Sequence, residues 1–181
     1  MILWKAFFKK ADFIFGHWPK NMNTCNQGSD LLLVDDLIYQ GKKIDIYLST
    51  TNNINLHELE QLCDAVGWIR RPFRKVKIAI DNSFLTISLF YNENNTKKMI
   101  GFARATSDHA FNATIWDVVI HPHFQGRGLG SALMDQIVQH LRCEDITTIT
   151  LFADPKVLSF YKSLGFITDP DGVKGMFWYP R

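Results

Sequence analysis

Hydrophobic and polar positions along the chain follow two different periods, which predicts both strands and helices. Two apolar runs near the start, LLLVDDLIY and KIDIYLST, flank a Gln40-Gly41 turn and predict two strands. The next segment, LHELEQLCDAV, repeats its apolar residues every three or four positions, as one face of a helix does. Asn55 precedes this helix as its expected N-cap and Gly67 ends it.

The segment RRPFRKVKIAIDNS, residues 70–83, fits either a strand or a helix. Val76, Ile78 and Ile80 alternate as in a strand, while a helix beginning near Pro72 would also gather apolar residues on one face. Its basic side chains favour a solvated helix face, although they could also contact a ligand's phosphates. These residues are Arg70, Arg71, Arg74, Lys75 and Lys77.

The second half of the chain predicts a hairpin followed by strands that alternate with helices. FLTISLFY and MIGFARAT form the hairpin, and TIWDVVIHP is the next strand. A glycine-rich loop then leads into a helix with leucine or isoleucine at every fourth position. ITTITLF predicts a strand, PKVLSFYKSLG a helix and KGMFWYP a final strand. This order predicts a mixed α+β sheet, mostly antiparallel and flanked by helices.

Composition narrows the class of protein. The chain has 181 residues, of which 46% are hydrophobic and 21% charged, as in a soluble globular domain. We expect residues 1–30 to form an N-terminal extension and linker and residues 31–181 to form the domain. The net charge of +2, without a block of like charges, gives no reason to expect nucleic acid or membrane as partner. The three cysteines form no metal-ligand pattern, so we expect no metal and a reducing compartment.

The glycine-rich loop that follows TIWDVVIHP, residues 125–130, is a candidate anion site. Glycines at positions 126, 128 and 130 permit positive φ and leave room for backbone to approach a ligand. The free N–H groups of the following helix and its dipole would face that ligand, with Arg127 in support. The glycine spacing G-x-G-x-G does not fit the Rossmann fingerprint, and G-K-[ST] of the P-loop is absent.

Two motifs together resemble the GNAT acetyltransferase superfamily. The first is V-x-I-H-P-x-x-Q-G-x-G-x-G, and the second, about thirty residues later, is A-D-P-x-x-x-x-F-Y-x-x-x-G-F. The resemblance spans about residues 44–181 and extends to plastid and cyanobacterial members, including plant serotonin N-acetyltransferases. It implies a GNAT fold with a splayed pair of parallel strands, and acetyl-CoA as co-substrate.

The resemblance also implies which residues hold the coenzyme. Pantetheine would pair with the exposed backbone of residues 118–120, in the strand before the glycine loop. One backbone N–H group of that strand would polarise the thioester carbonyl. The expected contacts are Val118, Val119, Ile120, Gln125, Gly126, Arg127, Gly128, Leu129, Gly130, Ser131, Asp154, Lys156 and Tyr161.

Tyr161 is the expected proton donor to the departing thiolate. Its ordinary pKa of about 10 exceeds the value of about 8.5 for a thiol, so it stays protonated at neutral pH. Asp117, within an apolar strand, and Asp154, where many family members have Asn, are equal candidates for handling the proton of the amine. Asp154 could instead cap the helix that follows. His109 and His121 are reserve candidates.

The predicted function is direct transfer of the acetyl group to a primary amine in a ternary complex. The acceptor is expected to be an arylalkylamine such as serotonin, or a lysine or N-terminal amine of a protein. Trp116 would line the binding site of an aromatic acceptor. A non-catalytic acyl-CoA-binding regulatory module is the alternative, and Tyr161 argues against it. The resemblance and the Lys-, Asn- and Ile-rich composition indicate the plastid stroma, or the cytoplasm of a cyanobacterium. The segment MFWYP could complete the sheet or pair across a homodimer.

Overall fold

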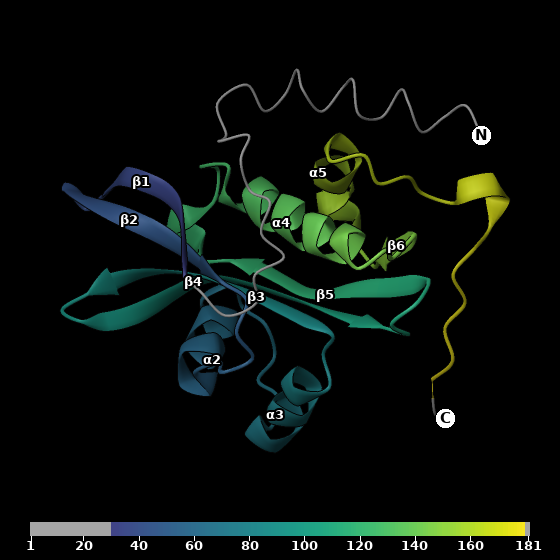
Figure 1. The fold of residues 1–181 in the computed structure, drawn as a ribbon, viewed down its shortest axis with the longest axis horizontal. Coiled ribbons are helices and arrows are strands. Elements are labelled where there is room, and N and C mark those ends of the chain that lie inside the picture. Colours follow the sequence, from purple (N-terminus) through teal and green to yellow (C-terminus); the bar gives the residue numbers. More distant parts are fainter. Residues whose placement is uncertain (1–29, 180–181) are drawn as a thin grey trace.

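The computed structural model describes residues 30–179, and these fold around one six-stranded sheet (Figure 1). The strands follow the order of the sequence, with antiparallel neighbours up to β5 and a parallel final pair. This arrangement confirms the predicted mixed, mostly antiparallel sheet. The strands are β1 (Leu31–Tyr39), β2 (Lys42–Ser49), β3 (Leu85–Glu93), β4 (Thr96–Ser107), β5 (Asn112–Ile120) and β6 (Thr148–Leu151).

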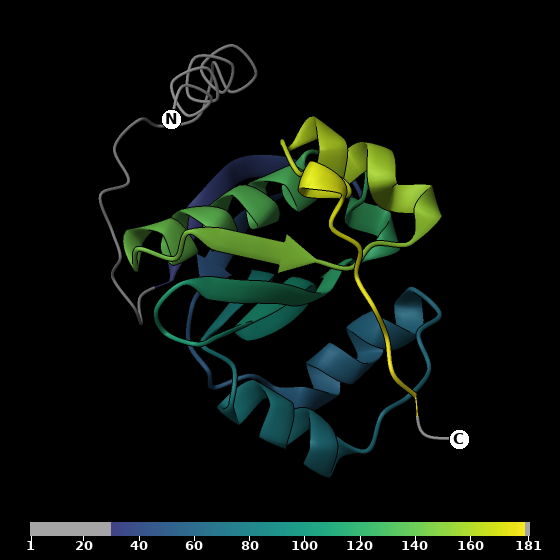
Figure 2. The ribbon, with the colours of Figure 1, turned by 90° about the vertical axis from the view of Figure 1, so that its right-hand side faces the viewer.

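Helices cover both faces of the sheet (Figures 1 and 2). One face carries α2 (Leu56–Ala65) and α3 (Phe73–Asp81), and the other carries α4 (Leu129–Cys143) and α5 (Leu158–Ser163). Short 3-10 turns, η1 (Pro122–Phe124), η2 (Pro155–Val157) and η3 (Pro170–Gly172), complete the fold. As predicted, the Asn55 side chain caps α2 by accepting hydrogen bonds from two backbone N–H groups.

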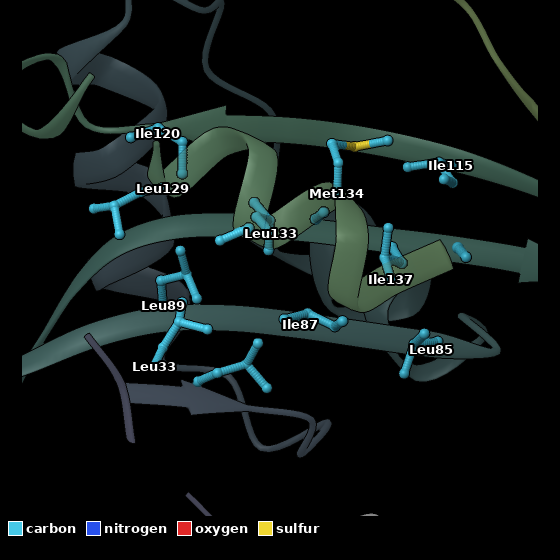
Figure 3. Close-up of a cluster of buried hydrophobic side chains, with 14 of the residues drawn as sticks. Leu33, Leu85, Ile87, Leu89, Ile115, Ile120, Leu129, Leu133, Met134 and Ile137 are labelled. Carbon is cyan, nitrogen blue, oxygen red and sulfur yellow. The ribbon is translucent and has the colours of Figure 1, made fainter. Parts of the chain in front are cut away.

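A β-bulge in β5 decides which of its residues enter the main core. In a regular strand, Ile115 and Ile120 would face opposite sides of the sheet, because they are five positions apart. Both instead belong to the core beneath α4 (Figure 3). The pairing with β4 slips between Trp116 and Val119, and Asp117 has a φ of 55°. The extra residue therefore reverses the alternation and turns the Asp117 side chain toward the α2 side, where it meets Arg71.

Two predictions about segments are decided by the structure. The ambiguous segment 70–83 contains the helix α3 and no strand. The predicted final strand KGMFWYP is wrong, because residues 173–179 form no regular element. A strand needs a neighbour for its backbone groups, and in the described part of the chain this segment has no strand partner. Its side chains are exposed, and the Phe177 ring contacts Phe152 with a centroid distance of 5.2 Å.

The remaining expectations about the ends of the chain lie largely outside the described residues. The predicted extension, residues 1–30, overlaps the described chain only at Asp30, whose carboxylate pairs with Lys97 on β4 at 2.7 Å. Among residues 30–179, no helix is long and apolar enough to cross a membrane.

Candidate active site

Strands β5 and β6 separate after only four paired positions. Their pairing begins at Asn112↔Thr148 and ends at Ile115↔Leu151. From Trp116 onward, the edge of β5 that faces β6 has no strand partner in the described structure. The unpaired edge is thus free to bind an extended ligand through its backbone.

A cavity of about 550 Å³ occupies this separation. Its lining residues come from the α2–α3 loop, residues 66–72, and from the α5 region, which lie on opposite faces of the sheet (Figure 2). Residues from five parts of the fold line it: Val66, Trp68, Ile69, Arg71, Ile115, Trp116, Asp117, Val118, Val119, Ile120, Gln125, Leu151, Phe152, Ala153, Asp154, Val157 and Tyr161. The cavity therefore connects the two faces at the point where the strands diverge.

The glycine loop lies at one end of the cavity, ahead of α4. The side-chain amide of Gln125 donates a hydrogen bond to the Ile120 carbonyl oxygen at 2.8 Å, which ties the loop to the end of β5. Gly126 and Gly128 have φ values of 73° and 80°, so both use the left-handed region that glycine adopts without strain. No side chain caps the first turn of α4, which leaves its N–H groups available to an anion.

Gly130 differs from the other two glycines of the loop. It belongs to α4 and has no positive φ, so the expectation of special backbone geometry is wrong at this position. A Cβ added to Gly130 would meet the Phe160 ring at 3.5 Å, which is an ordinary contact. Its neighbour Leu129 is buried in the core (Figure 3), so only the backbone of Leu129 can face a ligand.

Tyr161 and Asp154 lie on the α5 side of the cavity. Burial raises the pKa of the Tyr161 phenol above its ordinary value of 10.0, and the nearby Asp154 carboxylate raises it further. The Asp154 side chain makes no capping hydrogen bond to η2, so the cap interpretation of this residue is wrong. The phenol therefore remains a proton donor at neutral pH, with an ionisable carboxylate near it.

Asp117 occupies the β5 bulge between two arginines. One carboxylate oxygen accepts a hydrogen bond from Arg104 Nε at 2.6 Å, and the other accepts one from an Arg71 terminal nitrogen at 3.1 Å. The side chains of Arg104 and Asp117 are 14% and 19% exposed, so water screens this pair little. The carboxylate thus joins the bulge to the α2–α3 loop across the sheet.

Aromatic rings form another wall of the cavity. The Trp116 indole N–H donates to the Thr106 hydroxyl at 2.9 Å, which fixes the ring on the surface of the sheet. The Trp116 ring lies 5.5 Å from Phe152, and both rings line the cavity. This wall offers an apolar surface beside the unpaired edge of β5.

Several predicted residues lie around the cavity without lining it. Arg127 donates to the Ile38 carbonyl oxygen at 2.6 Å, which ties the glycine loop to the β1–β2 hairpin. Ser131 lies in the first turn of α4 and Lys156 lies in η2. The two reserve histidines are elsewhere: His109 packs on Phe84, and His121 lines a smaller cavity of about 150 Å³.

The sequence does not mark two parts of the cavity lining, the α2–α3 loop and the segment after β6. Arg71 belongs to the basic segment 70–77, for which the sequence favours a solvated helix face and leaves contact with a ligand's phosphates open. Trp68, Ile69 and Phe152 carried no local motif that could have marked them. In the described part of the chain, no cluster of His, Cys, Asp and Glu could hold a metal ion.

Comparison with known proteins agrees with this geometry. The sequence model of the Acetyltransferase (GNAT) family matches residues 53–166. N-acetyltransferase ycf52 of Gracilaria tenuistipitata var. liui is 61% identical over 180 residues, covering 99% of each chain. GCN5-related N-acetyltransferase 2, chloroplastic, of Arabidopsis thaliana is 44% identical, over 84% of this chain and 65% of the relative. The structure of AAC(6')-Iy with the bisubstrate analog CoA-S-monomethyl-acetylneamine is similar, with a TM-score of 0.57 and 16% identity, over 75% of this chain and 98% of that one. This last similarity concerns the fold.

Proposed function

The chain belongs to the GNAT acetyltransferase family, and from this premise we propose that it transfers acetyl from acetyl-CoA directly to a primary amine in the cavity between β5 and β6. One observation carries the proposal: the cavity joins both faces of the sheet at the unpaired edge of β5, with Tyr161 on its α5 side. Two substrates can thus approach the same point from opposite faces.

The coenzyme is assigned to the α4–α5 side of the sheet. Its pyrophosphate would meet the uncapped first turn of α4 and the backbone of Gly126 and Gly128. Pantetheine would extend along the β5 edge at residues 118–120 and pair with its backbone. The thioester carbonyl then lies where a β5 N–H group can stabilise the oxyanion that forms during transfer.

The transfer requires one bond to form, one to break and two proton movements. The lone pair of the neutral amine attacks the thioester carbon, a C–N bond forms and the C–S bond breaks. The amine nitrogen loses a proton to a base, and the thiolate of coenzyme A gains one from Tyr161. Because its pKa is raised, Tyr161 holds that proton across the neutral range.

Asp154 suits the role of base better than Asp117. Among the described residues, the Asp154 carboxylate has no hydrogen-bond or ion-pair partner, and it lines the cavity. The Asp117 carboxylate instead uses both oxygens to hold Arg104 and Arg71. We therefore assign Asp154 the proton of the amine, directly or through water, and Asp117 a positioning role.

The acceptor is a primary amine, either a small arylalkylamine such as serotonin or a protein amine. The wall formed by Trp116 and Phe152 supports an aromatic or apolar group beside the reacting amine. We place the protein in the plastid stroma, because a relative with 44% identity is named chloroplastic. The cytoplasm is the corresponding place in a cyanobacterium.

A two-stage experiment tests this function. Calorimetric titration with acetyl-CoA is expected to show micromolar binding, and adding serotonin, spermidine or lysine peptides is expected to release CoA. Absence of binding would overturn the assignment of the cavity. Binding without release of CoA for any amine would instead identify a non-catalytic acyl-CoA-binding module.

A further inference from the structure

The side of the cavity opposite the coenzyme carries an excess of positive charge. Segment 70–77 ends the α2–α3 loop and begins α3, and its five basic side chains are exposed. Three of them pair with single carboxylates: Arg70 with Asp64, Arg71 with Asp117, and Lys77 with Asp81. Arg74 and Lys75 have no ion-pair partner among residues 30–179. Segment 70–77 therefore adds positive charge on the side that the acceptor must approach, next to the carboxylates of Glu60, Asp64 and Asp81.

Arg71 brings this charge into the cavity itself. Its side chain is 44% exposed and lines the cavity beside Trp68 and Asp117. One terminal nitrogen donates to Asp117, and the guanidinium lies near enough to the half-buried Cys63 thiol to act against the rise in its pKa that burial causes. A guanidinium has five N–H donors in a planar fork, so Arg71 retains donors for a ligand that enters from this side.

Asp117 does not cancel the charge at this point. The same carboxylate is shared with Arg104, so two guanidinium groups meet one carboxylate in the bulge. Among residues 30–179, Arg104 has the Ser83 hydroxyl, at 3.5 Å, as its one other hydrogen-bond partner. The cluster of Arg71, Arg104 and Asp117 carries one net positive charge, and part of it is shielded from water, while the Asp154 carboxylate lines the α5 side of the same cavity.

This charge discriminates between acceptors. An amine without an acidic group, such as serotonin, forms no ion pair with Arg71, whereas an amine that carries a carboxylate nearby can pair that group with the guanidinium. An arginine binds a carboxylate through two parallel hydrogen bonds, which also fixes the orientation of the acceptor. Arg71 is attached through Asp117 to β5, the strand that would hold the thioester, so a carboxylate bound to it would be held at a fixed place relative to the thioester.

We infer that Arg71 is a specificity-determining residue that selects acceptor amines bearing a carboxylate close to the amine. The inference rests on the proposed function and names the chemistry of its acceptor. The carboxylate can belong to a free amino acid or to an acidic residue beside the amine of a peptide. In both cases Arg71 binds the carboxylate, and Asp117 and Arg104 hold Arg71 in place.

Matched pairs of acceptors test the inference. Tryptophan is compared with tryptamine for a free amino acid, and peptides beginning Ala-Glu are compared with peptides beginning Ala-Gln. With saturating acetyl-CoA, we expect kcat/KM for the acidic member to be higher by roughly tenfold, the scale of one charge-assisted hydrogen bond. We expect this difference between the acidic and the neutral acceptor to come from KM. We also expect it to decrease as the salt concentration is raised. A preference for tryptophan identifies a free amino acid as the source of the carboxylate, and a preference for the Ala-Glu peptide identifies an acidic residue of a peptide.

Variants of neighbouring arginines separate binding from a merely structural role. Arg71→Gln is expected to abolish the preference, and Arg71→Lys to keep part of it, because the charge remains but the fork is lost. Arg70→Gln is the matched control, because Arg70 pairs with Asp64 and does not line the cavity. The ratio of kcat/KM for the acidic acceptor to that for its neutral partner is compared between variants, so differences in the intrinsic reactivity of the amines cancel. Thermal melting verifies that each variant is folded.

The outcomes are distinguishable from failure of the proposed function. Transfer without a preference for the acidic acceptor, or a preference that survives Arg71→Gln, overturns the role of Arg71 and leaves the acetyltransferase assignment intact. Absence of CoA release with every acceptor overturns the proposed function and this inference with it.

Discussion

The two sides of the sheet build their halves of the cavity in different ways. On the α4–α5 side, the groups assigned to the coenzyme come mainly from one stretch of sequence, residues 118–131, and are mostly backbone. On the α2–α3 side, the wall consists of side chains from three separate segments, represented by Arg71, Trp116 and Phe152. The first half is a local motif, whereas the second exists only after folding.

We attribute this difference to what each half is proposed to recognise. A pyrophosphate and a pantetheine chain are invariant, and backbone N–H groups on a helix terminus and a strand edge suffice to bind them. An acceptor amine varies, so its recognition depends on side chains that can change without altering the fold. Substitutions on the α4–α5 side and on the α2–α3 side of the cavity should therefore have different effects.

The largest effect is expected for Tyr161→Phe. Loss of the phenol removes the proton donor to the thiolate, and general acid catalysis contributes roughly a hundredfold or more to kcat. Acetyl-CoA affinity should stay the same in calorimetry, since the ring is retained. Tyr47→Phe removes a hydroxyl on β2 away from the cavity and serves as control. Unchanged kcat in Tyr161→Phe would contradict the assigned role.

Asp154→Asn should lower kcat by roughly tenfold or more, since a carboxylate that accepts the proton of the amine is replaced by an amide. Steady-state kinetics with saturating substrates measure this effect. Asp117→Asn provides the comparison, because it also removes one carboxylate from the cavity. A larger loss of kcat in Asp117→Asn than in Asp154→Asn would reverse our assignment of the base.

Gly128→Ala is expected to weaken acetyl-CoA binding by about tenfold without changing kcat at saturation. The residue has a φ of 80°, and a left-handed conformation costs other residues about 1–2 kcal/mol. No atom lies within 4 Å of an added Cβ, so the effect is conformational. Gly172→Ala, with a φ of 76° and equally open space, controls for strain outside the loop. Equal affinities in the two variants would argue against the glycine loop as the coenzyme site.

Asp117→Asn should destabilise the fold by about 1–3 kcal/mol, because it leaves the mostly buried Arg104 guanidinium without its carboxylate. In a chain of this size, each kcal/mol lowers Tm by roughly 2–4 °C. Thermal melting measures the change. Asp64→Asn removes the exposed pair with Arg70 and is expected to cost less than about 1 kcal/mol. Similar melting temperatures for both variants would show that the bulge cluster does not stabilise the fold.

The smallest effect concerns the alkaline limb of the pH profile of kcat. Tyr161 acts in its protonated form, which is present below its pKa and lost above it. Because burial raises that pKa above 10.0, ionisation of Tyr161 should not lower kcat until the pH exceeds about 10. Profiles of the native protein and Tyr161→Phe measure this limb. A limb below pH 10 that disappears in the variant would mean that the phenol is more easily ionised than its burial implies.

Local sequence patterns predicted most of the elements, because their causes are local. The Asn55 cap, the periodicity of α4 and the positive φ at Gly126 and Gly128 each depend on a few adjacent residues. The final strand, MFWYP, was mispredicted for a related reason. Its composition favours extended backbone, but a strand also requires a partner edge, which no local pattern specifies.

The acceptor side could not be assembled from the sequence. Asp117 was noted for its carboxylate, but its two arginine partners are separated from it by 46 and 13 positions. The bulge that turns Asp117 toward Arg71 appears only in the pairing of β5 with β4. Arg71 itself looked like any solvated basic residue, because its neighbour across the sheet was unknown.

The sequence by itself determined the half of the cavity that we assign to the coenzyme: a strand, a glycine loop, a helix start and Tyr161 in a fixed order along the chain. These features depend on backbone conformation over a few residues, which adjacent side chains control. Only the tertiary structure decided the half that we assign to the acceptor, where Arg71, Arg104 and Asp117 meet around a β-bulge. Contacts between distant segments arise from strand register and helix packing, and one shifted residue in β5 is enough to determine which side chains face one another.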